Sequence, residues 1–232
     1  MNRRTGNPTG VRFTEEMRGH VSFGERDHER GAREGRASGT RLMFHLTIEV
    51  EDLDRFAADD RRAATARGWV RCEALGGRLP VERGDFNLLV DEDGPGRKRM
   101  LYRLFFRDGV GHPLTLSGTK FVGAGSGSRP WRDTTTLYVR VSRGHVEEDD
   151  PATEPVASGI LRLWPWDFAR QLATFRAGGD SLAARVAAVG RFDALFLGGL
   201  WQVYGRRFIG TRNRAAHALA NARRKLERWK PR

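Results

Sequence analysis

Three residues that could do acid–base chemistry lie near the middle of the 232-residue chain, namely His112, Lys120 and Asp133. Lys120 stands near the end of one expected strand and Asp133 at the start of the next. Strand pairing could therefore bring Lys120, Trp131 and Arg132 close to the aspartate. His112 lies in Gly-His-Pro at an expected turn, a weak place for a positioned general base. A small enzyme acting on an apolar substrate is one hypothesis, whereas a structural turn acid is the interpretation that we favour for Asp133.

The remaining polar motifs point away from a recognisable catalytic machinery. Paired carboxylates such as Glu15 and Glu16 are interpreted as solvated or capping residues, because a general acid needs an apolar pocket that raises its pKa. The glycine-rich stretch 123–127 is followed by Pro130 and another strand, so it lacks the helix N-terminus of a phosphate-binding loop. Ser126 has Ala124 two residues before it, where the Gly-x-Ser-x-Gly motif of a nucleophile elbow requires glycine.

Cofactor and metal patterns are equally absent from the sequence. No Gly-x-Gly-x-x-Gly or Walker pattern occurs in a strand-turn-helix context. The six histidines show no metal-ligand spacing, and the single cysteine, Cys72, excludes an intramolecular disulfide and a thiolate metal cage. We therefore predict no cofactor and no bound metal.

Two tryptophans, Trp164 and Trp166, flank Pro165 just before an expected helix that begins near Asp167. The plain interpretation is a hydrophobic staple with a proline near the first helical position. The functional interpretation is an apolar contact site for a partner protein or a lipid, because exposed aromatic clusters are costly unless they are used. This pair is the leading candidate binding site, and the further candidates are Lys120, Trp131, Arg132 and Asp133.

The net charge of +12 is concentrated at the C-terminal end of the chain. Residues 205–232 carry ten Lys or Arg and one acid, Glu227, so the other 31 basic and 28 acidic residues nearly balance. This tail lacks the aromatic–basic interleaving of RNA-binding modules, which argues against nucleic acid as a partner. An anionic membrane surface is the alternative partner. No apolar run approaches the roughly 18 residues of a membrane span, and we expect a cytoplasmic location.

Short strands separated by turn signals run through most of the chain. Glycine-rich and Asp-Gly turns divide them, and one strand-to-helix unit stands at 44–56 and another at 159–172. This pattern predicts a mainly β fold, either an antiparallel barrel or a sandwich. Alternating apolar residues predict strands that include 11–23, 41–50, 84–90, 99–107, 113–122 and 134–142.

Two segments depart from the strand pattern. Residues 24–41 lack apolar periodicity, which predicts a mobile loop or a long connection. After residue 180 the apolar residues recur at helical spacing. We therefore divide the chain into a β-rich domain at 1–180 and a two-helix segment with a basic tail at 181–232.

Several stretches, taken together and in order, resemble one known protein region. They are Phe13–Gly19, Arg99–Leu104, Pro113–Lys120, Trp131–Val139, Gly159–Leu161 with Asp167–Leu172, and Arg191–Gly205. The region is the non-catalytic part found in large bacterial proteins beside GMC-type, cholesterol-oxidase-like flavin oxidoreductases. The similarity covers about residues 11–205.

The resemblance implies an accessory module instead of the oxidoreductase itself, because the dinucleotide-binding fingerprint of that enzyme class is absent here. No catalytic residue is carried over from the family. Our leading hypothesis is a module that binds a flavin oxidoreductase or its apolar, sterol-like substrate. The alternatives are a small enzyme and a nucleic-acid or membrane-surface binder that works through residues 206–232.

Overall fold

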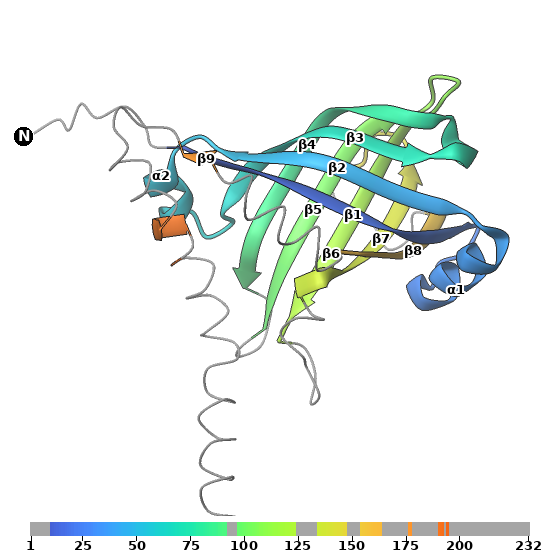
Figure 1. Ribbon diagram of the computed structural model, residues 1–232, viewed down its shortest axis with the longest axis horizontal. Coiled ribbons are helices and arrows are strands. Elements are labelled where there is room, and N and C mark those ends of the chain that lie inside the picture. The colour runs from blue at the N-terminus through green and yellow to red at the C-terminus, as the bar shows by residue number, and fades with distance from the viewer. Residues whose placement is uncertain are drawn as a thin grey trace, which may run out of the picture.

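The computed structural model describes residues 10–91, 97–123, 134–147, 154–163, 176–177, 190–192 and 194, and this part of the chain is mostly β-strand (Figure 1). Helical segments accompany the strands, among them α1 (His28–Ser38), α2 (Leu53–Ala58) and the short 3-10 helix Glu73–Leu75. The strands are β1 (Val11–Phe23), β2 (Arg41–Val50), β3 (Ala63–Cys72), β4 (Gly77–Asp91), β5 (Lys98–Arg107), β6 (Pro113–Val122), β7 (Thr136–Arg143), β8 (Pro155–Arg162) and β9 (Arg176–Ala177).

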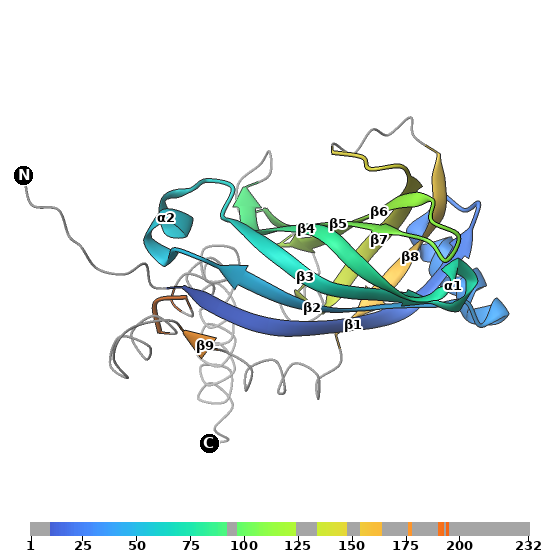
Figure 2. The same ribbon diagram turned by 90° about the horizontal axis from the view of Figure 1, so that it is seen from above.

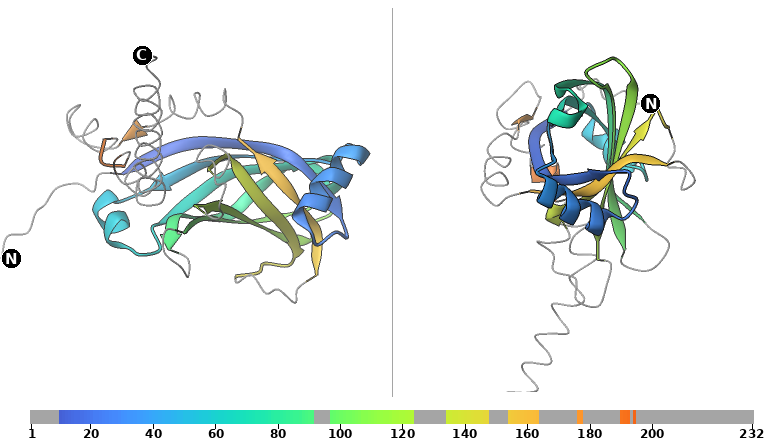
Figure 3. Two further views of the ribbon diagram at one scale, coloured as in Figure 1. Left: turned by 90° about the horizontal axis from the view of Figure 1, so that it is seen from below. Right: turned by 90° about the vertical axis from the view of Figure 1, so that its right-hand side faces the viewer.

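Eight of these strands form a closed antiparallel barrel. Each strand from β2 to β7 pairs with the next one along the chain, and β1 pairs with both β8 and β2. The right-hand view of Figure 3 shows the resulting ring nearly end-on. The short strand β9 adds to the start of β1, where Ala177 pairs with Val11. The prediction of a mainly β antiparallel fold is confirmed, and of its two alternatives the barrel is the one that forms.

Alternation along each strand places the core inside this ring. Strand β2 shows the pattern most simply, because every second residue from Leu42 to Val50 is buried and the residues between them are polar or partly exposed. Closure gives every strand of the ring two neighbours, so none of the eight strands is an edge strand. The barrel interior is therefore mostly apolar.

Helix α2 and residues 190–192 lie at one end of the barrel, opposite the end that carries α1 (Figure 2). Asp52 caps α2, because its side chain accepts hydrogen bonds from the backbone N–H groups of Asp54 and Arg55. The ring of Phe192 packs against those of Phe13 and Phe56, with centroids 5.7 and 6.1 Å apart. Phe192 thus ties residues that follow the last barrel strand to its core.

Helix α1 corrects the prediction of a mobile loop at 24–41, which is wrong for residues 28–38. The helix has ordinary end signals: Asp27 caps its N-terminus, and Gly39 ends it with a φ of 74°. It lacks an apolar stripe because it packs through two glycines, Gly31 and Gly35, both of which are buried. A Cβ atom on either residue would lie closer than 3.0 Å to the backbone of β8 or β1. The backbone of α1 therefore packs directly against the backbone of β1 and β8. A search for periodic apolar side chains does not detect such a helix.

Candidate functional site

Three polar side chains lie inside the barrel and contact one another among its apolar residues. They are Glu15 on β1, Tyr102 on β5 and Lys120 on β6, and we call them the interior trio. Each stands at an inward position of its strand, and their exposed fractions are 2%, 3% and 2%. Lys120 was a candidate from the sequence, whereas the other two were not.

Glu15 joins the other two members of the interior trio. The Lys120 ammonium donates a hydrogen bond to Oε1 of Glu15 at 2.6 Å, and the Tyr102 hydroxyl donates one to Oε2 at 2.7 Å. The Lys120 ammonium also lies 5.1 Å from the centroid of the Tyr102 ring. Burial, together with the charge and hydrogen bond of Glu15, raises the pKa of the Tyr102 hydroxyl well above its usual value, so this hydroxyl remains a donor.

The contacts of the interior trio cross the barrel instead of following the sheet. Strand β1 is four strands away from β5 around the ring in either direction, so Glu15 reaches across the interior to Tyr102 and Lys120. Tyr102 and Lys120 stand close together on neighbouring strands, because Tyr102 pairs with Gly118 and Met100 pairs with Lys120. The trio therefore links opposite walls of the barrel.

The surroundings of the interior trio are apolar and aromatic. The rings of Phe86 and Phe44 lie 4.9 and 5.8 Å from that of Tyr102. Removing a lysine and a glutamate from water costs several kcal/mol per ion, and the mutual attraction of the pair often no more than offsets that cost. A contribution to stability is thus a weak explanation for burying Glu15 and Lys120. Strongly desolvated ionisable groups are common at functional sites.

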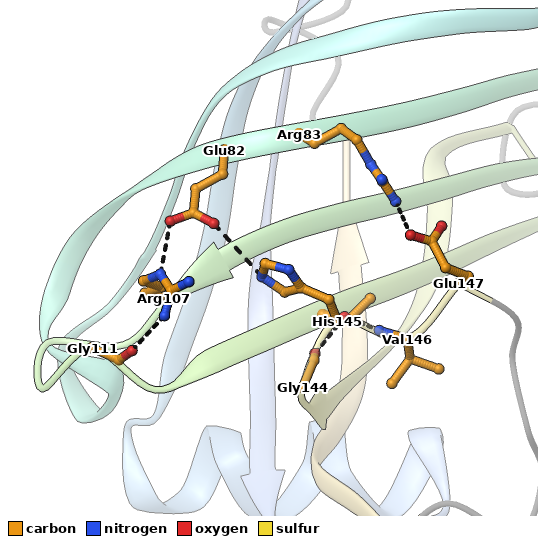
Figure 4. Close-up of polar contacts among 9 residues, drawn as sticks. Glu82, Arg83, Arg107, Gly111, Gly144, His145, Val146 and Glu147 are labelled. Carbon is orange, nitrogen blue, oxygen red and sulfur yellow. Dashed lines mark hydrogen bonds and ion pairs between the residues drawn. The ribbon is translucent and has the colours of Figure 1, made fainter.

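A second polar cluster lies on the outer wall, beside the C-terminal end of β5 (Figure 4). Glu82 accepts a hydrogen bond from Arg107 at 3.0 Å and lies 3.6 Å from Nε2 of His145. Arg83 donates to Glu147 at 2.5 Å. These side chains are between 37% and 64% exposed, and exposed ion pairs of this kind contribute little to stability.

This outer cluster covers an aromatic residue that points away from the core. The guanidinium of Arg83 lies over the ring of Phe105 at 4.0 Å, and the His145 ring meets the same phenylalanine edge-on at 5.3 Å. Phe105 is only 1% exposed as a result. The cluster thus fastens the segment after β7 onto the barrel wall, and its partners satisfy one another without an evident position for a ligand.

His28, in the first turn of α1, makes stability depend on pH. Its ring packs edge-on against Tyr138, with centroids 5.8 Å apart. Burial, and then the positive charge of Arg140, lower its pKa from the ordinary 6.5. A lowered pKa means that the unfolded chain binds a proton more readily than the folded protein, so stability falls as the pH drops below about 6.5.

We therefore expect His28→Gln to reduce the loss of unfolding free energy between pH 7.5 and pH 5.5, measured by urea denaturation. Part of the loss should remain, because burial followed by the charges of Arg41 and Arg36 also lowers the pKa of His20. The variant and the natural protein should both show little pH dependence between pH 7.5 and 8.5. An unchanged difference between pH 7.5 and 5.5 in the variant would contradict this assignment.

The residues predicted to work together for catalysis are not brought together where the structure describes them. Lys120 points into the barrel, whereas His112 lies in an exposed turn and contacts Asp108 at 3.1 Å. Eight residues of extended chain separate the two, roughly 25 Å at about 3.3 Å per residue. Asp133, Trp131, Arg132, Trp164 and Trp166 lie outside the described residues, as does most of the segment at 181–232.

The interpretation of Glu15 as a solvated or capping acid is wrong. Glu15 follows Val11 and Phe13 at every second position of β1, so it shares their inward face. Tyr102 holds the same phase on β5, between Met100 and Leu104. That shared phase was the signal available in the sequence, although it did not show that the two strands lie opposite each other.

No protein-family model matches this chain, and no curated protein or solved structure matches it. Within the described ranges, no helix is long and apolar enough to cross a membrane. The same residues contain no group of three or more His, Cys, Asp or Glu side chains arranged to hold a metal ion. The resemblance to the oxidoreductase-associated region therefore stays a prediction.

Proposed function

We propose that this chain is a non-catalytic binding module that holds an apolar, sterol-like molecule in its barrel and serves a GMC-type flavin oxidoreductase. The observation that carries the proposal is the interior trio in a mostly apolar barrel. Ligand sites are mostly apolar with a few polar groups that fix orientation, and an eight-stranded barrel can hold one small molecule. The resemblance of residues 11–205 supports the choice of partner.

Lys120 is the member of the interior trio that can hold a ligand. An ammonium group has three N–H donors, and one of them is used by Glu15 in the described structure. The other two can donate to an oxygen atom of a bound molecule. Glu15 and Tyr102 keep the ammonium in place, because both oxygens of Glu15 accept a hydrogen bond from the trio. The arrangement suits binding and orientation of a ligand.

The proposal is tested with a steroid that carries a single polar group, 5α-androstan-3β-ol. We expect the purified chain to bind one molecule, with the stoichiometry read by native mass spectrometry and the affinity by equilibrium dialysis. The matched control is the apolar triple variant, E15M/Y102F/K120M, which keeps side chains of similar size without the polar anchor. It should bind at least roughly tenfold more weakly, the value of one lost hydrogen bond to a charged group. Absence of steroid binding to the natural chain would overturn the proposal.

The partner is tested separately by affinity purification of the tagged chain from its native host. A flavin oxidoreductase should be recovered, and the recovery should persist with the apolar triple variant, because the interior trio is hidden from a docking protein. If neither the natural chain nor the triple variant recovers an oxidoreductase, this enzyme is not the partner. Steroid binding is then decided by the dialysis experiment alone.

A further inference from the structure

The charge balance inside the barrel determines which polar group a ligand can bring there. Among the described residues, the buried charged side chains are Glu15, Lys98 and Lys120. Lys120 is neutralised by Glu15, and Lys98 donates to Asp91 at 2.6 Å. Each buried lysine therefore already has a carboxylate partner, and neither offers an uncompensated positive charge.

We propose that Glu15 is the residue that restricts the barrel to neutral ligands, so that it accepts an alcohol or a ketone and excludes a carboxylate. This inference rests on the proposed function, since it concerns the same interior site. A ligand carboxylate would bring a second negative charge next to Glu15 in an apolar environment. Burying a charge without a partner is costly, whereas a neutral oxygen can accept a hydrogen bond from Lys120 without altering the charge balance.

A neutral oxygen also fits what remains of the hydrogen-bonding capacity of the interior trio. Lys120 retains two N–H donors, which an alcohol or ketone oxygen can accept. A carboxylate would have to compete with Glu15 for the same ammonium, and the group that lost would be buried without a cation. Selection thus works by rejecting the wrong charge as well as by binding the right oxygen, as specific sites commonly do.

The direct test compares two steroids that share one skeleton and differ only at carbon 3, namely 5α-androstan-3β-ol and 5α-androstane-3β-carboxylic acid. At pH 8 the carboxylic acid is almost wholly ionised. We expect the natural chain to bind the alcohol at least roughly tenfold more tightly than the carboxylate by equilibrium dialysis. Equal or tighter binding of the carboxylate would overturn this inference and leave the proposed function standing. Failure of both steroids to bind would instead overturn the proposed function.

The variant Glu15→Gln provides a second readout that a purely structural role would not produce. It keeps the size and planar shape of the side chain, but it replaces one of the two acceptor oxygens with an NH2 donor and leaves the Lys120 charge without a carboxylate partner. The preference should therefore reverse, and the carboxylate should raise the melting temperature of E15Q more than the alcohol does. The matched control is Glu16→Gln, because Glu16 neighbours Glu15 but lies outside the barrel, where its carboxylate is 3.5 Å from His45. E16Q should keep the natural preference, and a reversal in E16Q or none in a folded E15Q would contradict the role of Glu15.

Discussion

Replacing Lys120 with methionine should lower the free energy of unfolding by about 3–5 kcal/mol, one of the two largest effects that we expect in this protein. Methionine matches the lysine stem in size, so the change removes the ammonium and little of the packing. Glu15 then keeps a buried negative charge whose nearest cation is gone, and only the hydrogen bond from Tyr102 remains. Chemical denaturation at pH 8 measures the loss.

The apolar triple variant distinguishes two causes of instability in K120M, namely the unpaired charge of Glu15 and the lost packing of the Lys120 side chain. With Glu15, Tyr102 and Lys120 all replaced, no polar group is left unpaired inside the barrel. Stability should then return to within about 1–2 kcal/mol of the natural protein or exceed it, because buried ion pairs often contribute little compared with well-packed apolar residues. A triple variant as unstable as K120M would show that the cost comes from packing, and a stable K120M would show that the pair does not form.

Adding a methyl group to either glycine in α1 should destabilise the protein by about 1–3 kcal/mol, in the opposite direction to what helix propensity predicts. The Cβ of an alanine at position 31 would meet the carbonyl oxygen of Ser158, and one at position 35 would meet that of Val21. Both obstacles are backbone atoms of barrel strands, which have little freedom to move. The helix would have to lift away from β1 and β8, and the variants G31A and G35A report this cost by denaturation.

The control for this experiment is Arg33→Ala, on the exposed side of the same helix. This substitution should change the unfolding free energy by less than about 0.5 kcal/mol. If G31A and G35A proved as stable as the natural protein, or more stable by the roughly 1 kcal/mol that alanine gains over glycine in a free helix, α1 would not be docked through its glycine face.

The strands could be recognised from the sequence because the barrel wall obeys a simple local rule. Residues 11–23, 41–50 and 113–122 alternate in polarity, and all three ranges coincide with observed strands. Helix α1 was missed although Asp27 and Gly39 marked its ends, because its packing face consists of glycines instead of apolar side chains. Apolar periodicity detects helices that bury their side chains, whereas α1 buries its backbone.

The candidate site was recoverable only in part for a related reason. Lys120 was a candidate only because it could lie near Asp133, and the inward phases of Glu15 and Tyr102 were present in the sequence. Nothing local connects position 15 with positions 102 and 120, because these contacts span 87 and 105 residues of chain. The leading candidates Trp164 and Trp166 stay untested predictions.

The sequence by itself determined the class of this protein, most of its strands, and the absence of common cofactor motifs, since each depends on residues close together in the chain. Tertiary structure decided that the sheet closes into a barrel instead of splitting into a sandwich, because closure depends on β1 pairing with both β2 and β8. The same closure places β1 opposite β5 and brings Glu15 to Tyr102 and Lys120. Proximity across a barrel is a property of the whole ring, so no single strand could reveal it.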